Sequence, residues 1–465
     1  MTIDTLAAIE ALGARTVEAS LLPARLAVGT DTRSVAAGST FLALRGDRFD
    51  GHAFVAEAFA RGAAACIVAD PASVPPGAPA LVVADTLRAY LQLAELARRA
   101  LRGPVIAISG SAGKTTTKSY LTALLTAAGR AVAATPENEN NEIGVSKFLL
   151  GLEPGDPRIA VVEMGARKEG DIDVLVAAAR PQIAVLTNIG EAHLEIMGTP
   201  ERLAHTKWGL FRGGARAVLN LADAASRARA ATLAETPVWF GLGDEAAPAG
   251  EPAIVIRDAR TLVVSDAGGR REIAIDARVP GDHNRRNLAA ALAAASVAGV
   301  RPEALVPSIP HLTQPSKRYE IIELAGGQRL IFDAYNASMS GTLATLDAFA
   351  REAAQRRIAV LGSMAELGAD APLMHQRVGA AAAGASEIVL AGGDFAADIV
   401  RGATAAGAAG ARVLTYAGNA AAVDWLRANA RPGDAILLKG SRKYKMEEIA
   451  DALRGEPGAP GTNAR

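Results

Sequence analysis

The stretch Val105–Thr117 reads VIAISGSAGKTTT and decides the fold of the sequence around it. An apolar run stops at a small turn, the turn ends in Gly113-Lys114-Thr115, and a helix-compatible sequence follows. Backbone amides in such a turn approach phosphate oxygens, the helix N-terminus adds positive potential, and the lysine and threonine supply a charge and a magnesium ligand. The alternative is a chance Gly-Lys-Thr in a surface loop, which the preceding strand and the following helix disfavour. The stretch predicts a nucleotide phosphate loop.

The loop departs from the general motif GxxxxGK[ST] in one respect. That motif needs glycine at position 108, where this chain has Ile108. The loop is instead the shorter form SGSAGKTT over residues 109–116.

The composition is that of a large α/β protein. The 465 residues predict about three domains of roughly 150 residues each. Half of the residues are apolar and only 4% are aromatic, which favours helices packed closely on parallel sheets. The formal net charge is zero, so a nucleic-acid binder with a basic surface is not expected. Cys66 lies in the apolar run AAACIVAD and is expected in a core, in a reducing compartment. A catalytic thiol remains the minor alternative.

No segment predicts secretion or membrane insertion. The N-terminal sequence MTIDTLAAIEALGAR has no basic region before an apolar core. The longest apolar run, residues 288–300, is too short to span a bilayer. We therefore expect a soluble, cytoplasmic protein.

Two linkers divide the chain into three expected domains, residues 1–102, 103–312 and 313–465. Leu101-Arg102-Gly103-Pro104 forms the first linker, and Pro307, Pro310 and Pro315 mark the second. In the first domain we expect a strand at 40–44, a helix at about 53–61, a strand at 66–69 and a helix at 87–100.

The second and third domains alternate strands and helices, which indicates parallel α/β sheets. In the second domain, strands are predicted at 105–108, 159–163, 183–188 and 217–221, followed by short antiparallel strands over 253–279 and an Ala-rich helix from near Asn284. In the third, strands are predicted at 329–333, 358–362, 388–391, 412–416 and 435–438. The third domain is expected to be doubly wound and Rossmann-like. No GxGxxG follows its first strand, so we expect no dinucleotide there.

Two chemistry-bearing side chains follow strands of the second domain. Glu163 ends the apolar strand IAVVEMG, and ligands bind at the carboxyl ends of strands in open sheets. Glu163 is therefore a candidate magnesium ligand or water-orienting group, with a helix-capping acid as the alternative. His193 follows the next strand in the same way and is a candidate second ligand or a structural histidine. Lys207 is a solvated lysine unless it is buried near a metal, where its pKa falls and it can react.

Two polar loops of the second domain are further candidates. The turn Asn138–Gly144, with Asn140 and Asn141, offers donors and acceptors for phosphate or substrate oxygens, or is an ordinary turn. In GDHNRRN, residues 281–287, Asp282 or Asn284 is expected to cap the helix, while Asn287 could face a base.

In the third domain, Asp333-Ala334-Tyr335-Asn336 follows the first strand, the usual place of a functional loop. Lys439 and Arg442 follow the last strand and could clamp an anionic substrate. The alternative, basic residues at a helix N-terminus, is electrostatically disfavoured.

Together these motifs resemble the Mur ligase family, and most closely its MurF type, over essentially the whole chain. The motifs that carry the resemblance are DTRSVAAGSTFLALRGDRFDGH, SGSAGKTTT, NENNEIGVS, EMGARKEGDI, TNIGEAHLE, the region around Lys207, GDHNRRNLAAALAA, DAYNAS, VLGSMAELG with His375, and KGSRKYKMEE. The Asp-x-Tyr-Asn loop and the LGxMxELG segment indicate the MurF type. The resemblance implies a cytoplasmic ATP-dependent ligase of peptidoglycan synthesis, expected as a monomer, which adds D-alanyl-D-alanine to UDP-N-acetylmuramoyl-tripeptide through an acyl phosphate.

The resemblance also implies a role for each site residue. ATP would be bound by Gly110, Ser111, Ala112, Gly113, Lys114, Thr115, Thr116, Asn287 (at adenine), Arg318 and Asp333. Magnesium would be held by Thr115, Glu163, His193 and Lys207, the last as a carbamylated lysine, and Lys114, Glu163, His193 and Lys207 would form the catalytic set. The UDP-sugar tripeptide and the dipeptide would contact Thr32, Arg33, Asn140, Asn141, Tyr335, Asn336, Lys439 and Arg442.

The chain departs from the MurF pattern at several positions. Ser338 and Met339 replace an Asn-Pro pair, Ser363 replaces an aspartate, and Ser146 replaces a proline. Since an aspartate at 363 could pair with a substrate ammonium, we expect a weakened preference for D-Ala-D-Ala, or a different dipeptide, and a return toward D-Ala-D-Ala in Ser363→Asp. Two other functions remain open: a Mur-type ligase of specialised metabolism joining another amine and acid, and a catalytically weak nucleotide-binding regulator or scaffold.

Overall fold

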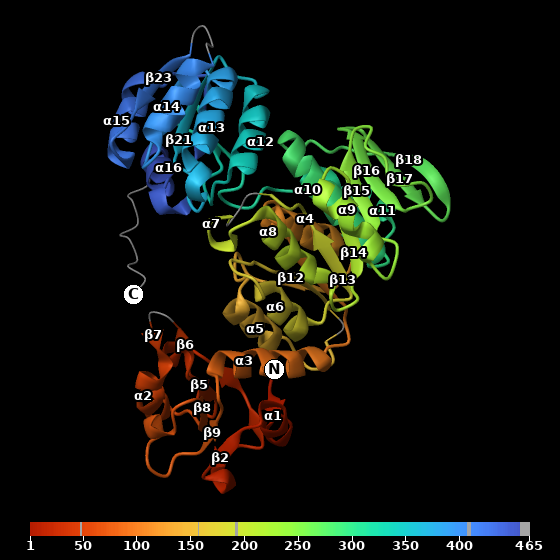
Figure 1. The fold of residues 1–465 in the computed structure, drawn as a ribbon, viewed down its shortest axis with the longest axis vertical. Coiled ribbons are helices and arrows are strands. Elements are labelled where there is room, and N and C mark those ends of the chain that lie inside the picture. The colour runs from red at the N-terminus through yellow and green to blue at the C-terminus, as the bar shows by residue number, and fades with distance from the viewer. Residues whose placement is uncertain (47–48, 157, 191–193, 407–410, 456–465) are drawn as a thin grey trace.

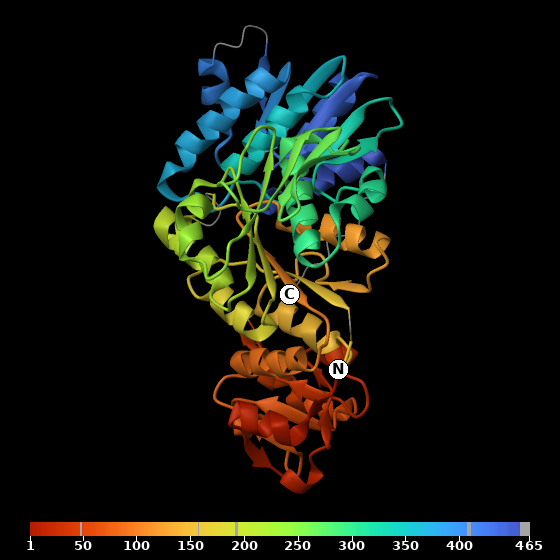
Figure 2. The ribbon, with the colours of Figure 1, turned by 90° about the vertical axis from the view of Figure 1, so that its right-hand side faces the viewer.

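The computed structural model describes residues 1–46, 49–156, 158–190, 194–406 and 411–455. They form three α/β domains arranged in a row, which confirms the predicted fold class (Figure 1). The view turned by 90° shows the N-terminal domain at one end and the C-terminal domain packed on the middle one (Figure 2).

The N-terminal domain is built on a small mixed sheet. Among the described residues this sheet has the order β2-β9-β8-β5-β4, with only β2 antiparallel to its neighbour. Helix α3 begins at its N-cap Asp85 and packs against α5 and α6 of the next domain, so it joins the two domains (Figure 1). The elements are β1 Ile3–Asp4, α1 Thr5–Leu12, β2 Arg15–Val17, β3 Arg25–Leu26, β4 Val28–Gly29, β5 Thr40–Leu42, β6 Arg45–Gly46, β7 Phe49–Asp50, α2 Val55–Ala60, β8 Ala65–Val68, β9 Ala80–Val82 and α3 Thr86–Arg99.

The middle domain has a large sheet covered on both faces by helices. Its described strands have the order β11-β12-β10-β13-β14-β15-β16-β17-β18, parallel as far as β16 and antiparallel at β17 and β18. Ile106 and Ile108 of β10 pack into the core beneath α4 and α10, whereas Val105 and Ala107 pack into the core on the opposite face. Burial on both faces explains the continuous apolar run of β10. The elements are β10 Val105–Ser109, α4 Lys114–Ala127, β11 Val132–Ala134, α5 Glu142–Gly151, β12 Ile159–Glu163, α6 Asp171–Ala179, β13 Ile183–Leu186, α7 Leu194–Met197, α8 Pro200–Trp208, β14 Arg216–Asn220, α9 Ala224–Arg229, β15 Val238–Leu242, β16 Ala253–Asp258, β17 Thr261–Asp266, β18 Gly269–Ala274, α10 Gly281–Val297 and α11 Pro302–Leu305.

The C-terminal domain is a doubly wound sheet with one antiparallel edge strand. The order within the described residues is β19-β20-β24-β21-β22-β23, and β19 alone is antiparallel. The elements are β19 Glu320–Glu323, β20 Arg329–Phe332, α12 Met339–Ala350, β21 Arg356–Gly362, α13 Ala371–Ala385, β22 Ile388–Gly392, α14 Ala396–Ala405, β23 Arg412–Thr415, α15 Asn419–Asn429, β24 Asp434–Lys439 and α16 Glu447–Arg454. Helix α12 packs against α10 of the middle domain, which brings the two domains together (Figure 1).

The structure differs from the sequence prediction in several details. The strands that were not predicted are β1 to β4, β6, β7 and β9 in the N-terminal domain, β11 and β15 in the middle domain and β19 in the C-terminal domain. The predicted helix at 53–61 is a 3₁₀ turn followed by the short α2. Helix α10 begins after Pro280, and neither Asp282 nor Asn284 caps it: Asp282 pairs with Arg285, and the Asn284 amide donates to the carbonyl of Pro280. Cys66 is fully buried, as predicted, and burial raises the pKa of its thiol to about 12.

Candidate active site

The phosphate loop lies between the end of β10 and the start of α4, and two of its positions require glycine. Gly110 has φ +147° and Gly113 has φ +82°. A Cβ at Gly110 would lie 1.9 Å from Oγ1 of Thr187, and one at Gly113 would lie 2.3 Å from Oδ1 of Asn287. The side chains of Thr187, which follows β13, and of Asn287 on α10 therefore lie directly against the loop backbone. The predicted contact of Asn287 with a base stays a prediction.

Strand β13 holds the loop in shape through the two residues that follow it. The backbone N–H of Ser111 donates to the carbonyl of Asn188 at 3.0 Å, and that of Ala112 donates to Oδ1 of Asn188 at 2.9 Å. The Thr187 hydroxyl donates to the carbonyl of Ala112 at 2.5 Å. Thr187 and Asn188 were not among the predicted site residues, although their place at the carboxyl end of a predicted strand was a usable signal.

Two lysine ammonium groups meet at one backbone carbonyl of the loop. Nζ of Lys114 donates to the Gly110 carbonyl at 2.8 Å, and Nζ of Lys207 donates to the same oxygen at 3.3 Å. The Lys207 side chain is 1% exposed. Burial, with a smaller contribution from Lys114, lowers the pKa of Lys207 to about 7. Burial also lowers the pKa of Lys114, against the opposing charge of Glu163. The expectation of a solvated Lys207 is therefore wrong, because the side chain is buried. Its reactivity near a metal stays a prediction.

Glu163, at the end of β12, is the buried carboxylate beside the loop. Its Oε1 accepts from the Thr115 hydroxyl at 3.2 Å and from the Asn140 amide at 2.8 Å. Nζ of Lys118 lies 3.1 Å from Oε2. Lys118 lies one helical turn after Lys114, so the two side chains lie on the same face of α4. This spacing could have identified Lys118 from the sequence, but the prediction did not include it.

The oxygen donors at this point fit a magnesium ion. Mg²⁺ binds through one or two carboxylates together with substrate phosphates, rather than in a cage of protein ligands. The neighbouring hydroxyl of Thr115 and carboxylate of Glu163 supply such donors at the mouth of the phosphate loop. Within the described ranges, no group of three or more His, Cys, Asp or Glu side chains is placed to hold a metal ion. Of the other two predicted ligands, Lys207 is the buried lysine at the Gly110 carbonyl, and His193 lies outside the described residues.

The C-terminal domain reaches the phosphate loop through Arg318. Its Nη2 donates to the Thr115 hydroxyl at 3.3 Å, and its Cζ lies 4.0 Å from the centre of the Tyr335 ring. Asp333, at the end of β20, accepts from Thr345 at 2.5 Å and pairs with Lys439 at 2.8 Å. The predicted clamp of Lys439 and Arg442 is thus partly engaged within the protein.

The remaining predicted residues lie apart from the loop or have local roles. Thr32 and Arg33 lie in the N-terminal domain between β4 and β5, where the exposed Arg33 pairs with Asp31 at 2.7 Å. Asn141 caps α5 by accepting from the N–H of Gly144. Arg442 is exposed, 5.6 Å from the Tyr335 ring, and Asn336 is exposed and gives its carbonyl to Lys439. Thr116 is buried in the first turn of α4.

Ser363 does not lie where the sequence analysis placed it. Its side chain is 0% exposed, donates to the carbonyl of Gly392 and accepts from the N–H of Phe395. It therefore holds the loop after β22 and cannot contact an incoming amine. Ser338 caps α12 by accepting from Gly341. The prediction that Ser363→Asp restores a substrate contact is wrong, because the side chain at position 363 is fully buried.

We expect Ser363→Asp to destabilise the protein instead. The substitution would bury a carboxylate against the Gly392 carbonyl, which costs about 3 kcal/mol. The control Ser20→Asp, at an exposed position, should change the free energy of unfolding by less than about 0.5 kcal/mol. Urea denaturation of both variants checks this, and equal midpoints would contradict the buried position of Ser363.

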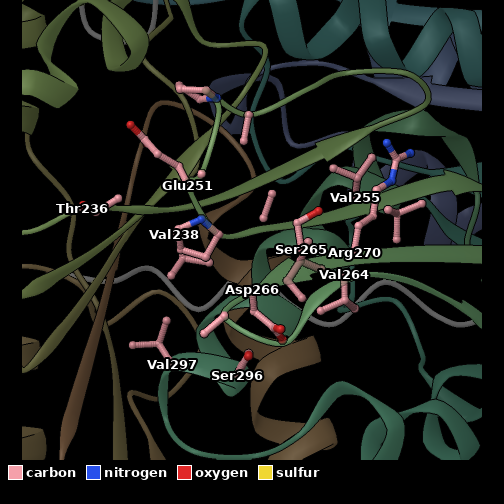
Figure 3. Close-up of a pocket in the computed structure, with 18 of the residues that line it drawn as sticks. Thr236, Val238, Glu251, Val255, Val264, Ser265, Asp266, Arg270, Ser296 and Val297 are labelled. Carbon is pink, nitrogen blue, oxygen red and sulfur yellow. The ribbon is translucent and has the colours of Figure 1, made fainter.

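A cavity in the described part of the chain lies toward the amino ends of the strands of the middle domain's sheet. It has a volume of about 1380 Å³ and is lined by the loop before β16, by β15 to β18 and by the end of α10 (Figure 3). Its lining includes Ile183 and Arg216, which begin β13 and β14, whereas the phosphate loop lies at the carboxyl ends of the strands. None of the predicted site residues lines this cavity.

Helices long and apolar enough to cross a bilayer are absent from the described ranges.

Comparisons with known proteins match segments of all three domains. Three family profiles match: "Mur ligase family, catalytic domain" over residues 27–102, "Mur ligase middle domain" over 108–295, and "Mur ligase, glutamate ligase domain" over 317–442. The chain is 34% identical to the UDP-N-acetylmuramoyl-tripeptide--D-alanyl-D-alanine ligase of Synechocystis sp. over 92% of this chain and 91% of that protein.

Solved structures give the same result for the whole chain. MurF from Acinetobacter baumannii superposes with a TM-score of 0.84 at 27% identity, covering 98% of this chain and 99% of that one. The MurF ligase of Thermotoga maritima, solved in complex with ADP, superposes with a TM-score of 0.79 at 26% identity, covering 92% of this chain and 97% of that one.

Proposed function

Because this chain belongs to the Mur ligase family, we propose that it is the ATP-dependent ligase that joins D-alanyl-D-alanine to UDP-N-acetylmuramoyl-tripeptide in peptidoglycan synthesis. One observation carries the proposal: Arg318 of the C-terminal domain donates to Thr115 of the middle domain's phosphate loop. A nucleotide held by that loop therefore lies between two domains, where a phosphoryl group can pass to a second substrate. The two substrates are proposed because the chain is similar over nearly its full length to relatives named for this activity.

In the proposed reaction, a terminal carboxylate oxygen of the tripeptide attacks the γ-phosphorus of ATP. The bond to the β-phosphate oxygen breaks, ADP leaves and an acyl phosphate forms. The dipeptide amine then attacks the acyl carbon, loses a proton, and phosphate leaves as the amide forms. Negative charge develops on the transferred phosphoryl group, so Lys114 and Arg318 act by stabilising charge at fixed positions. Closely packed domains keep water from the acyl phosphate.

Thr115 and Glu163 would hold Mg²⁺, with the Glu163 carboxylate oriented by Asn140 and Lys118. When bound, the ion would screen the charge of the phosphates. Lys207 supports a carbamate because only an uncharged amine adds CO₂, and its lowered pKa leaves much of it uncharged near neutral pH. The carbamate would turn a buried cation into an anion with two oxygens facing the loop. His193 keeps its proposed place as a further ligand.

The substrates are assigned by domain. Residues 1–102 would bind the uridine nucleotide near Thr32 and Arg33, residues 103–312 would bind ATP, with Asn140 and Asn141 near the tripeptide, and residues 313–465 would deliver the dipeptide. Asn287 would face adenine, and Asp333 would contact ATP. Tyr335 and Asn336 follow β20, Lys439 ends β24 and Arg442 follows it, and these four residues would contact the dipeptide. A cytoplasmic monomer remains our prediction for the working form.

The proposal is tested by measuring ADP release with UDP-N-acetylmuramoyl-tripeptide, with and without D-Ala-D-Ala. We expect ADP release to depend on both substrates and the product to carry the added dipeptide by mass. Release of ADP with a different dipeptide only would indicate a ligase of another pathway. No substrate-dependent release would contradict the proposal and favour a nucleotide-binding regulator.

A further inference from the structure

The guanidinium of Arg318 is held by an aromatic ring. Its Cζ lies 4.0 Å from the centre of the Tyr335 ring, while its Nη2 donates to Thr115 at the phosphate loop. At that distance the negative face of the ring attracts the cation. Tyr335 lies on the loop after β20, in the C-terminal domain. The ring therefore contacts the one described side chain of this domain that hydrogen-bonds to the loop.

The backbone on both sides of Arg318 is strained. Lys317 has φ +61° and Tyr319 has φ +58°, a region that side chains other than glycine rarely adopt. Strain of this kind persists only where the surroundings fix it, and it concentrates at functional sites. Here Glu320 accepts from the N–H of Lys317 at 2.9 Å, the Lys317 carbonyl accepts from the N–H of Tyr335 at 3.2 Å, and Tyr319 is fully buried.

These contacts tie the Arg318 turn and the Tyr335 loop to each other twice, once through the backbone and once through ring and guanidinium. Two carboxylates attract Arg318, those of Asp333 and Glu163. Each of them already pairs with a lysine: Asp333 with Lys439, and Glu163 with Lys118. Charge alone therefore leaves the direction of the Arg318 side chain weakly defined, and the ring defines it.

We propose that Tyr335 is a positioning residue, whose ring holds the Arg318 guanidinium against the phosphate loop and so prepares it to meet the γ-phosphate of ATP. The inference rests on the proposed function. It assigns the role to the aromatic face, and not to the phenolic hydroxyl. It also makes Tyr335 act through Arg318, so that its contribution depends on the arginine being present.

A double-mutant cycle between positions 335 and 318 tests the proposal. Tyr335→Leu should lower kcat/KM for ATP about tenfold, the size of a partly desolvated cation–π contact, and Tyr335→Phe should recover most of this loss because it restores the ring. In an Arg318→Ala background, Tyr335→Leu should add less than about twofold, since coupled residues are not additive. Trp425→Leu is the matched control, as it removes a half-buried ring from α15, which Figure 1 shows on the side of the domain away from α12.

The affinity of the same proteins for a non-hydrolysable ATP analogue, measured by calorimetry, should follow the same pattern. This binding measurement separates the inference from the proposed function, because it requires no ligation. The inference is overturned if Tyr335→Leu behaves as the parent or as Trp425→Leu does, if Tyr335→Phe is as defective as Tyr335→Leu, or if the effects of Tyr335→Leu and Arg318→Ala multiply.

Discussion

Lys114→Ala should lower the rate of ligation about 10³-fold or more while the protein stays folded. The lysine is held at the mouth of the phosphate loop by the Gly110 carbonyl, and its side chain contributes charge rather than packing. Removing it would take away one of the cations that lie at the loop. The measurement is kcat at saturating ATP, with circular dichroism to establish that the fold is intact.

Arg99→Ala serves as the control for loss of a cation, because Arg99 is exposed on α3 and pairs only at the surface with Glu95. It should leave the rate close to that of the parent. Near-normal turnover in a folded Lys114→Ala protein would contradict the assignment of the loop.

Lys207→Ala should abolish ligation to a similar extent, with partial rescue by a small carboxylate such as acetate. If the Lys207 amine carries CO₂, its truncation removes two anionic oxygens at the phosphate loop, and acetate can replace them. Lys207→Arg is the matched variant, because it keeps a cation but cannot form the carbamate, and it should be inactive as well.

A second readout is independent of turnover. In ¹³C NMR with ¹³C-labelled bicarbonate, the parent protein should show a carbamate carbon that Lys207→Ala and Lys207→Arg lack. A parent spectrum without that signal, or full activity in Lys207→Arg, would refute the carbamate.

The fold was largely predictable because local pattern and long-range structure agree. The run Val105–Ile108 is apolar on both faces because helices cover both faces of the sheet. The turn that follows needs glycine at positions 110 and 113, and the sequence has glycine at both. Strand β19 was missed because Glu320–Glu323 alternates exposed and half-buried residues on a sheet edge, where no continuous apolar run can form. Strand β15 was missed because it contains Gly241, which weakens a strand pattern.

The site was predictable where a side chain follows a strand directly, as with Glu163, and less so where its environment comes from distant segments. Nothing around Lys207 in sequence indicates that it is 1% exposed, because the segments that bury it include Gly110, 97 residues away. Ser363 is the opposite case, a residue that was expected to contact a substrate and is buried instead. Its position after a strand suggested substrate contact, yet the loop after β22 folds over it and uses both its hydrogen-bonding capacities. Sequence places such residues on an edge of the sheet, but burial decides whether they face a ligand.

The central claim is that the substrate carboxylate is converted into an acyl phosphate. Its most direct test follows the carboxylate oxygen into the released phosphate. The enzyme is given UDP-N-acetylmuramoyl-tripeptide whose terminal carboxylate carries ¹⁸O, together with ATP and D-Ala-D-Ala, and the phosphate released is analysed by mass. If the carboxylate is phosphorylated and the dipeptide amine then displaces phosphate, each phosphate carries one ¹⁸O from the substrate. Phosphate without ¹⁸O would contradict the acyl phosphate, and with it the account of this site as that of an amide ligase.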